Sequence, residues 1–162
     1  MKEIIVVSDT HGAEENLRKI VRKEKNAYAM FFLGDGEADL RVVEEENPRL
    51  PVYAVRGNCD FGSFLPLDGL TAFDGVLFYY THGHIYNAKF GLDDLAEAGR
   101  SRGADVVLFG HTHQGIMRHC GDVTLFNPGS AGRSYSGYDG YGIIKLGGGG
   151  TVEFEHKMVS EL

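Results

Sequence analysis

The chain has 162 residues and a mass of 17.8 kDa, a length that predicts a single domain covering residues 1–162. Hydrophobic residues make up 43% of it and charged residues 24%, a balance that excludes disordered and fibrous proteins. The net charge of −7 argues against binding to nucleic acid or anionic membranes, because both require clustered lysine and arginine. We therefore expect no extended nucleic-acid surface and no membrane partner.

The N-terminus and the cysteines bear on location. The opening MKEIIVVSDTHG lacks the apolar stretch of about 7–15 residues that marks a secretory signal peptide. The longest apolar runs, such as Ile4–Val7 and Ala29–Leu33, are too short to span a bilayer. Two cysteines, Cys59 and Cys120, lie far apart in the chain, which favours a reducing compartment. We expect a cytoplasmic protein.

Strands and helices alternate in the first half of the chain. A short β-branched run that ends at a turn predicts a strand at Glu3–Ser8, and apolar runs stopped by glycine predict strands at Ala29–Leu33 and Val52–Val55. Apolar residues spaced within charged segments predict helices at Ala13–Lys25 and Glu37–Glu46. This order predicts a parallel sheet with right-handed crossovers.

The second half carries more antiparallel signals. Residues 59–75 are expected to be irregular, and they precede a strand at Val76–Tyr80, a helix at Tyr86–Arg102 and a strand at Val106–Phe109. Strands joined by hairpins are predicted at Gly115–His119, Val123–Phe126, Gly140–Leu146 and Thr151–Lys157. A sandwich of two sheets therefore fits the pattern better than one open sheet.

Polar side chains of metal-binding types follow five of the predicted strands. The five segments are Ser8-Asp9-Thr10-His11-Gly12, Gly34-Asp35-Gly36, Gly57-Asn58-Cys59-Asp60, Thr81-His82-Gly83-His84 and Gly110-His111-Thr112-His113. Because ligands gather beyond the carboxyl ends of parallel strands, we expect these segments to meet at one edge. Three of them carry pairs spaced two residues apart, and this spacing places both side chains on one face of extended backbone.

A single Asp-x-His or His-x-His pair is usually a cap or a solvated pair. Here, however, five of the seven histidines lie in such pairs, each after an apolar strand and beside glycine. Burying so many imidazoles and carboxylates without partners would cost several kcal/mol, and a metal cluster removes that cost. The other two histidines, His119 and His156, fall within predicted strands and are interpreted as surface or structural residues.

In order and spacing, the five segments resemble the motifs of the calcineurin-like metallophosphoesterases. The closest likeness is to the small, single-domain bacterial and archaeal phosphodiesterases of that superfamily. The resemblance runs from Ser8 to about Ser130 and includes Asn127-Pro128-Gly129-Ser130, which is similar to the closing loop of the small members. It implies an α/β fold in which a two-sheet β-sandwich is flanked by helices, in four αββα layers.

The resemblance also implies two divalent metal ions. Asp9, His11 and His113 match ligands of the first metal, Asp35 matches a carboxylate that bridges both, and Asn58, His82 and His111 match ligands of the second. Oxygen and imidazole donors without thiolate suit manganese, iron, nickel or zinc, and manganese is the favoured choice. Hydroxide held by the two metals would attack phosphorus in line.

The expected activity is therefore hydrolysis of small phosphodiesters by a metal-dependent phosphodiesterase. One alternative is a phosphomonoesterase that uses the same metals, and assays on paired nitrophenyl monoesters and diesters would separate the two. Another is a non-catalytic metal-binding scaffold, similar to the retromer subunit of the superfamily. Metal titration that restored no hydrolysis would favour the scaffold.

The sequence departs from the larger family at the residue that is thought to protonate the leaving oxygen. Many larger members read Gly-Asn-His-Asp, whereas this chain has Cys59 in place of that histidine, as is usual in the small subgroup. A thiol has a higher reference pKa than imidazole and is a poorer hydrogen-bonding group. His84, which shares a face with His82 and is not assigned to a metal, is a second candidate. Equally, His84 could be only a hydrogen-bond partner of a ligand.

Several residues near the motifs have two interpretations each. Arg56 and Arg133 could clamp a substrate phosphate or form surface ion pairs. Asp39 and Asp60 are expected to cap or support the ligand loops. Apolar side chains near the third motif and after the Asn-Pro-Gly turn could stack on a nucleobase or form a homo-oligomer interface, and we prefer the interface. These side chains are Phe61, Phe64, Leu65, Tyr135, Tyr138 and Tyr141.

Overall fold

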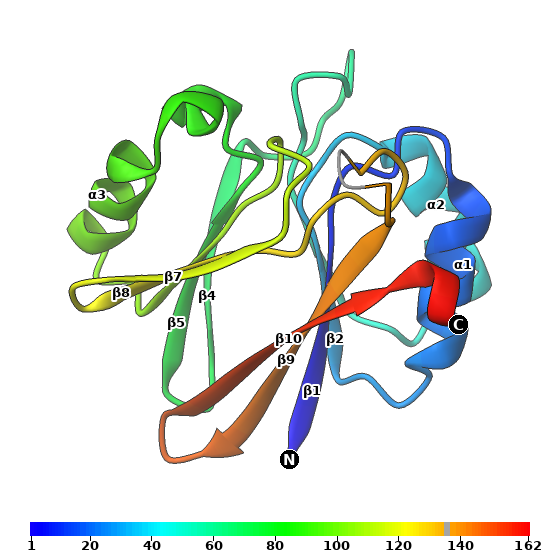
Figure 1. The fold of residues 1–162 in the computed structure, drawn as a ribbon. Helices are drawn as coiled ribbons and strands as arrows, with labels where there is room; N and C mark the ends of the chain where they lie inside the picture. Colours follow the sequence, from blue (N-terminus) through cyan, green and yellow to red (C-terminus); the bar gives the residue numbers. More distant parts are fainter. Residues whose placement is uncertain (135–136) are drawn as a thin grey trace.

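Two five-stranded β-sheets face each other in the computed structural model, which describes residues 1–134 and 137–162 (Figure 1). The first sheet has the order β10-β9-β1-β2-β3 and the second β4-β5-β6-β8-β7. The first contains β1 (Lys2–Val7), β2 (Ala29–Phe32), β3 (Val52–Ala54), β9 (Gly140–Gly148) and β10 (Thr151–Met158). The second contains β4 (Asp68–Phe73), β5 (Val76–Thr81), β6 (Val106–Leu108), β7 (Ile116–Cys120) and β8 (Val123–Asn127).

Helices cover the outer face of each sheet. The α-helices are α1 (Glu14–Lys23), α2 (Glu37–Glu46) and α3 (Asp93–Ser101), and short 3-10 turns form η1 (His84–Tyr86), η2 (Ala88–Phe90) and η3 (Val159–Glu161). Leu17 of α1 and Leu40 of α2 pack against the first sheet, whereas Leu95 of α3 packs against the second. The layers therefore run helix, sheet, sheet, helix, which confirms the expected fold class (Figure 1). Within the described ranges, no helix is both long and apolar enough to cross a membrane.

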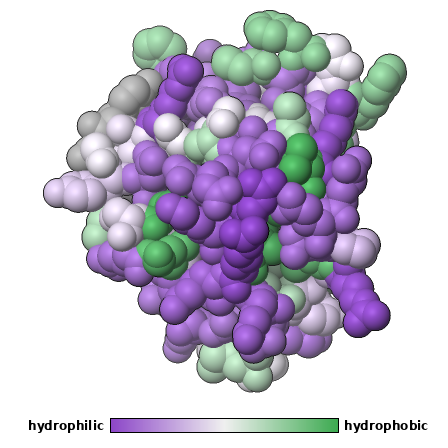
Figure 2. All heavy atoms as spheres, turned by 90° about the vertical axis from the view of Figure 1, so that its right-hand side faces the viewer, coloured by the Kyte–Doolittle hydropathy of each residue, from purple (hydrophilic) through white to green (hydrophobic). Residues whose placement is uncertain are grey.

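Strand β1 shows why the sequence folds into layers. Ile4 and Val6 point into the core between the sheets, and Ile5 and Val7 point toward α1 and α2. All four side chains are fully buried, which is why the strand appears as a continuous apolar run instead of an alternating one. On the helix side, hydrophilic side chains dominate the outer surface (Figure 2).

Parallel pairing brings the motif-bearing loops to one end of the molecule. Strands β1, β2 and β3 pair in parallel, and so do β5, β6 and β8. Backbone hydrogen bonds then join successive loops within each sheet, such as Asp9 N–H to the Gly34 carbonyl and Gly110 N–H to the His82 carbonyl. The predicted strands, and the helices of the first half, are confirmed to within two residues at each end.

The predicted helix over Tyr86–Arg102 is wrong in its first half. The α-helix begins only at Asp93, and two 3-10 turns precede it. Asn87 has φ 52° and Gly91 has φ 153°, and backbone at positive φ cannot continue a right-handed helix. This segment is instead wound against Gly83, whose carbonyl accepts the Ala88 N–H.

The expectation that residues 59–75 are irregular is also wrong at its end. Strand β4 occupies Asp68–Phe73 and pairs antiparallel with β5. The two strands are joined through Asp74 and Gly75, which have φ of 50° and 82°. A two-residue Asp-Gly turn with both φ positive is the favoured connection of a β-hairpin.

Candidate metal centre

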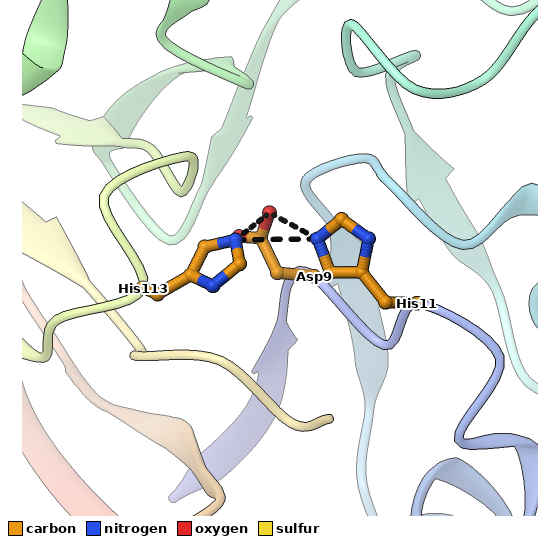
Figure 3. Close-up of side chains that lie close together, drawn as sticks. All are labelled: Asp9, His11 and His113. Carbon is orange, nitrogen blue, oxygen red and sulfur yellow. Dashed lines mark hydrogen bonds and ion pairs between the residues drawn. The ribbon is translucent and has the colours of Figure 1, made fainter. Parts of the chain in front are cut away.

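Asp9 directly follows β1 and is fully buried. Its Oδ2 accepts hydrogen bonds from the Ser8 hydroxyl at 2.6 Å and from the His111 backbone N–H at 3.0 Å. Its Oδ1 makes no hydrogen bond and lies 3.3 Å from His113 Nε2 and 3.5 Å from His11 Nε2. Figure 3 shows the carboxylate between the two rings. The fold thus fixes one oxygen and leaves the other facing two histidines.

The rings of His11 and His113 turn their Nε2 atoms toward each other at 3.2 Å. His113 Nδ1 lies 2.7 Å from the Arg133 carbonyl oxygen. Because a carbonyl can only accept, Nδ1 carries the proton, and the neutral ring presents a lone pair at Nε2. Two imidazole nitrogens and a carboxylate oxygen therefore face one another, an arrangement that suits a cation.

Asp35 follows β2 and lies between this group and a second one. Its Oδ1 accepts the Cys59 backbone N–H at 2.8 Å. Its Oδ2 lies 3.2 Å from His82 Nε2 and 3.7 Å from His11 Nε2. The same carboxylate oxygen therefore faces a histidine from each sheet.

His82 and His111 form the side of the site that the second sheet contributes. His82 is fully buried, and its Nδ1 donates to the Leu33 carbonyl at 2.6 Å. Its Nε2 makes no hydrogen bond and faces Asp35. The rings of His111 and His84 lie 5.0 and 5.4 Å from the His82 ring. The buried Nδ1 of His84 also makes no hydrogen bond.

Asn58 and Cys59 lie exposed on the loop after β3. The Asn58 amide nitrogen is 3.6 Å from the Cys59 sulfur, and no contact found in the described ranges brings this amide to another predicted ligand. The Cys59 sulfur, one ring nitrogen of His11 and one carboxylate oxygen of Asp35 lie within 4.8 Å of one another. Cys59 and Cys120 are both free thiols.

Charge in the site is set by burial and by close carboxylate–histidine pairs. Burial raises the pKa of Asp9 and Asp35, but the neighbouring histidines outweigh it and hold both pKa values below their usual range. Burial, together with the charge of His82, lowers the pKa of His111 to about 4. Burial and the Asp35 charge raise the pKa of the Cys59 thiol. The carboxylates are therefore ionised, His111 is neutral and Cys59 is protonated at neutral pH.

The backbone adopts an unfavourable conformation at these same residues. Seven non-glycine residues of the described ranges have positive φ. Five of the seven are predicted ligands, namely Asp9, His11, Asp35, His111 and His113, with φ between 45° and 68°. Each such residue costs on the order of 1–3 kcal/mol and persists where surrounding structure enforces it, most often at functional sites. The concentration of such residues makes this end of the sheets the candidate functional site.

Two glycines allow the ligand loops to approach one another. A Cβ at Gly57 would collide with the Asp35 carboxylate, and one at Gly110 would collide with the Ser8 hydroxyl and the Asp9 carboxylate. Any side chain at either position would therefore displace a predicted ligand. The sequence placed both glycines in motifs without revealing these contacts.

Two further carboxylates hold the loops, as expected for Asp39 and Asp60. Asp60 accepts backbone N–H groups from Asp35, Gly36, Glu37 and Gly57 at 2.8–3.1 Å. Asp39 accepts hydrogen bonds from the Thr10 hydroxyl and the Gly12 N–H. Neither residue groups with the predicted ligands, so their role is to position the backbone.

Other supporting residues were not identified from sequence. Asn127 is fully buried and donates to the Gly110 carbonyl and the Thr112 hydroxyl, which fixes the loop that carries His111. Ser130, also buried, donates to the Asp9 carbonyl. The Asn-Pro-Gly-Ser motif signalled this loop but not its contacts, and the one between Ser130 and Asp9 joins residues 121 positions apart.

The remaining predicted residues lie around the site or away from it. Arg56 donates to the Leu65 carbonyl at 2.8 Å and so holds the loop after β3, while Arg133 meets His113 through its backbone carbonyl. His156 donates to the Asn127 carbonyl at 2.7 Å, which makes it structural, and His119 is exposed on β7 near Thr124.

The apolar cluster proposed for an interface is only partly at the surface. Phe61, Phe64 and Tyr138 are exposed by 90%, 99% and 62%, whereas Leu65 is half-buried. Tyr141 contradicts the expectation, because it lies on the helix side of β9, is fully buried and donates to Glu24 at 2.7 Å. Tyr135 lies outside the described residues.

Comparison with known proteins identifies the class that this fold and site define. A model of the calcineurin-like phosphoesterase superfamily domain matches residues 1–148. The chain therefore belongs to the calcineurin-like phosphoesterase superfamily, a family that binds divalent metals. It is 33% identical over 129 residues to the probable metallophosphoesterase YsnB of Bacillus subtilis, covering 78% of this chain and 73% of that protein. It is 28% identical over 158 residues to phosphodiesterase MJ0936 of Methanocaldococcus jannaschii, covering 88% and 92%.

Solved structures share the same fold. A predicted phosphoesterase from Streptococcus pneumoniae superposes with a TM-score of 0.83 at 24% identity, over 98% of this chain and 90% of that one. Vps29 of Entamoeba histolytica in complex with Zn²⁺ superposes with a TM-score of 0.76 at 18% identity, over 97% and 99%. The fold is therefore shared by proteins named as phosphoesterases and by Vps29.

Proposed function

We propose that this chain is a phosphodiesterase that hydrolyses small phosphodiesters with the help of two divalent metal ions. The observation that carries the proposal is the convergence of two trios of donors at one end of the sheets. Asp9, His11 and His113 form one trio, and Asp35, His82 and His111 form the other. Within each trio, the donor atoms lie within 4.8 Å of one another.

The donor atoms themselves fit divalent cations. Asp9 Oδ1 and His82 Nε2 are buried without a hydrogen-bond partner, a costly state that a bound cation relieves. His82 and His113 each fix Nδ1 on a backbone carbonyl and present Nε2, the usual arrangement of metal-binding histidine. Carboxylate and imidazole donors suit manganese, iron, nickel or zinc, and we favour manganese.

The two trios suggest how the ligands divide. We assign Asp9, His11 and His113 to the first ion and His82 and His111 to the second, with Asn58 completing the second set from the loop after β3. Asp35 is assigned to both ions, because its Oδ2 faces His82 of one trio and His11 of the other.

When bound, two such ions polarise a phosphoryl oxygen and acidify a water that can attack phosphorus. The protein's own residues hold the substrate and manage the leaving-group proton. His84 borders the second trio and has an unpartnered Nδ1, so it is our first choice of hydrogen-bond donor to the leaving oxygen. The protonated Cys59 thiol, beside His11 and Asp35, is the alternative donor.

Metal reconstitution tests the proposal directly. Protein stripped by chelation should regain hydrolysis of bis(4-nitrophenyl) phosphate when Mn²⁺ is added, with much lower activity on 4-nitrophenyl phosphate. His113→Ala should abolish most of this activity, while the matched control His119→Ala, on exposed β7, should retain it. A preference for the monoester would identify a phosphomonoesterase on the same site.

A non-catalytic scaffold is the second candidate, favoured by the shared fold with Vps29. Exposed phenylalanines on the loop after β3 and on η2, including Phe64 at 99% and Phe90 at 91%, offer apolar surface for a partner. Figure 2 shows apolar side chains standing at the upper end of the molecule, where Figure 1 places the loop after β3. Metal-loaded protein that hydrolyses no phosphoester would favour this function.

A further inference from the structure

A cavity of about 380 Å³ opens beside the loop that carries His111 and His113. It lies between η2 and the start of α3 on one side and the edge strand β7 on the other. Thr112, the residue between His111 and His113, forms part of its wall. The volume falls within the range of roughly 300–1,000 Å³ that is usual for small-molecule sites. Because Thr112 lies between two predicted ligands, a molecule bound in this cavity would lie beside the loop that carries them.

Two cations line this cavity and no acidic residue does. Lys89 comes from η2 and Arg118 from β7. Across residues 1–134 and 137–162, neither side chain has an ion pair or a side-chain hydrogen bond, although Asp and Glu outnumber Lys and Arg by 23 to 16. Arg18, by contrast, is paired with Glu14, Glu15 and Glu46. Unpaired cations that converge in an acidic protein point to an anionic ligand.

Strand register places Arg118 on the cavity side of β7. Arg118 lies opposite Leu125, which is fully buried on the face of the second sheet that α3 covers. Alternation along the strand puts Met117 and His119 on the opposite face. The Arg118 side chain therefore projects toward the α3 side, where η2 brings Lys89.

Tight turns position Lys89. The positive φ values of Asn87 and Gly91 wind the backbone on both sides of η2. Lys89 lies between these two turns and lines the same cavity as Arg118.

We propose that this cavity binds a second phosphate group of the substrate, so that preferred substrates carry a phosphate monoester beside the scissile phosphodiester. The inference rests on the proposed phosphodiesterase function. A phosphate monoester carries a charge of about −1.5 to −2 at neutral pH, which matches two cations. Arg118 can bind it through two parallel N–H groups and Lys89 as a point charge. Leu92 and Ile116, which are half-buried and also in the lining, offer apolar surface to the linking carbons.

Three diesters with the same 4-nitrophenolate leaving group test the inference. In each diester, a second alcohol is also esterified to the scissile phosphate. Ethanol adds no charge, 2-hydroxyethyl phosphate adds an anionic group, and choline adds a cationic group. We expect wild-type kcat/KM to be about tenfold higher for the phosphate-bearing ester than for the ethyl ester, and lowest for the choline ester, as suits charge-assisted contacts that are partly exposed. Lys89→Met or Arg118→Met should reduce this preference to about threefold, and the double variant should abolish it.

A matched control and a binding measurement complete the test. Lys19→Met removes one positive charge from the exposed face of α1 and should leave the tenfold preference intact. By calorimetry, metal-loaded wild type should bind ethane-1,2-bisphosphonate more tightly than ethylphosphonate, and the double variant should bind both equally. Equal binding by wild type, or a preference that survives in the double variant, overturns the inference. If the bisphosphonate binds more tightly but no diester is hydrolysed, the anion site stands and the proposed activity fails.

Discussion

Four of the candidate ligands are held through the part of the side chain that faces away from the centre. Asp9 is fixed at Oδ2 by Ser8 and by the backbone of His111, and Asp35 is fixed at Oδ1 by the backbone of Cys59. His82 and His113 are fixed at Nδ1 by carbonyl groups. The opposite atoms are therefore preorganised before any ligand binds, which limits the entropy lost on binding.

The shared position of Asp35 predicts unequal effects of two ligand substitutions. Asp35→Asn removes the charge between the trios and should lower the occupancy of both metals, whereas His113→Ala should mainly empty the first site. Metal content per protein, measured by elemental analysis after equal loading and buffer exchange, checks this. Equal losses from the two substitutions would contradict the division of ligands.

The residue at position 59 predicts a strong dependence on the leaving group. The pKa of the Cys59 thiol is raised by burial and by Asp35, so the thiol is a weak acid. Because general acids contribute typically about 10²–10⁴-fold, Cys59→His should accelerate diesters with alkoxide leaving groups by about tenfold or more and flatten the plot of rate against leaving-group pKa. Unchanged rates with alkoxide leaving groups would show that the acid at this position is not limiting.

At the scale of elements, sequence predicted best where one local signal decides the structure. The strands that precede the motifs are short apolar runs that end at polar or glycine residues, and each was found. The helix predicted over Tyr86–Arg102 was too long, because its apolar spacing does not reveal that Asn87 adopts φ 52°.

Strand β4 was missed although Asp74-Gly75 is a hairpin signal, since Gly69 and Pro66 nearby suggested irregular chain. The role of Ser130 depends on a contact with Asp9, 121 positions away, and that of Asn127 on a contact with the loop at Gly110. No local pattern encodes either contact.

The end of α1 is tied to the sheet by an ionic contact that predicts pH-dependent stability. Glu24 accepts hydrogen bonds from Lys157 at 2.8 Å and from Tyr141 at 2.7 Å. Burial raises the pKa of Glu24, but these two bonds outweigh it and hold the pKa below the reference value of 4.5. A carboxyl whose pKa is lowered on folding stabilises the protein above its unfolded pKa, and this contribution is lost as pH falls through the folded pKa.

We therefore expect Glu24→Gln to lower the free energy of unfolding by about 1 kcal/mol at pH 7. The difference from wild type should shrink as the pH falls below 4.5. Urea unfolding of both proteins at pH 7 and at a pH below 4.5, in the presence of chelator, measures this difference in the free energy of unfolding. Tyr141→Phe, which keeps the ion pair with Lys157, serves as the matched control and should lose less. A difference that stays constant with pH would show that the carboxylate charge does not stabilise the fold.

At the scale of the whole molecule, both sheets supply residues to the candidate metal centre. The first sheet supplies Asp9, His11, Asp35 and Asn58, and the second supplies His82, His111 and His113. The two sheets are packed together through a core that includes Phe31 of one sheet and Phe78 of the other. The sequence indicated the strands of each half and, through the resemblance, the layers. The relative placement of the sheets arises from packing between distant side chains, which periodicity does not specify.

Because ligands come from both sheets, bound metal should stabilise the molecule as a whole. For each site that it fills in the folded state, an ion at 100 times its dissociation constant adds about 2.7 kcal/mol to the free energy of unfolding. For a domain of this size, that corresponds to a rise in melting temperature of about 5–10 °C. We expect calorimetric scans to show such a rise when Mn²⁺ is added to chelated protein, and His119→Ala to show the same rise. The first metal ion is otherwise held by residues of the first sheet, and His113 is its ligand from the second sheet. His113→Ala should therefore show a clearly smaller rise in melting temperature. If protein with its full metal content melted at the temperature of the chelated form, the ions would not connect the sheets, and the preorganised carboxylates and imidazoles would need another explanation.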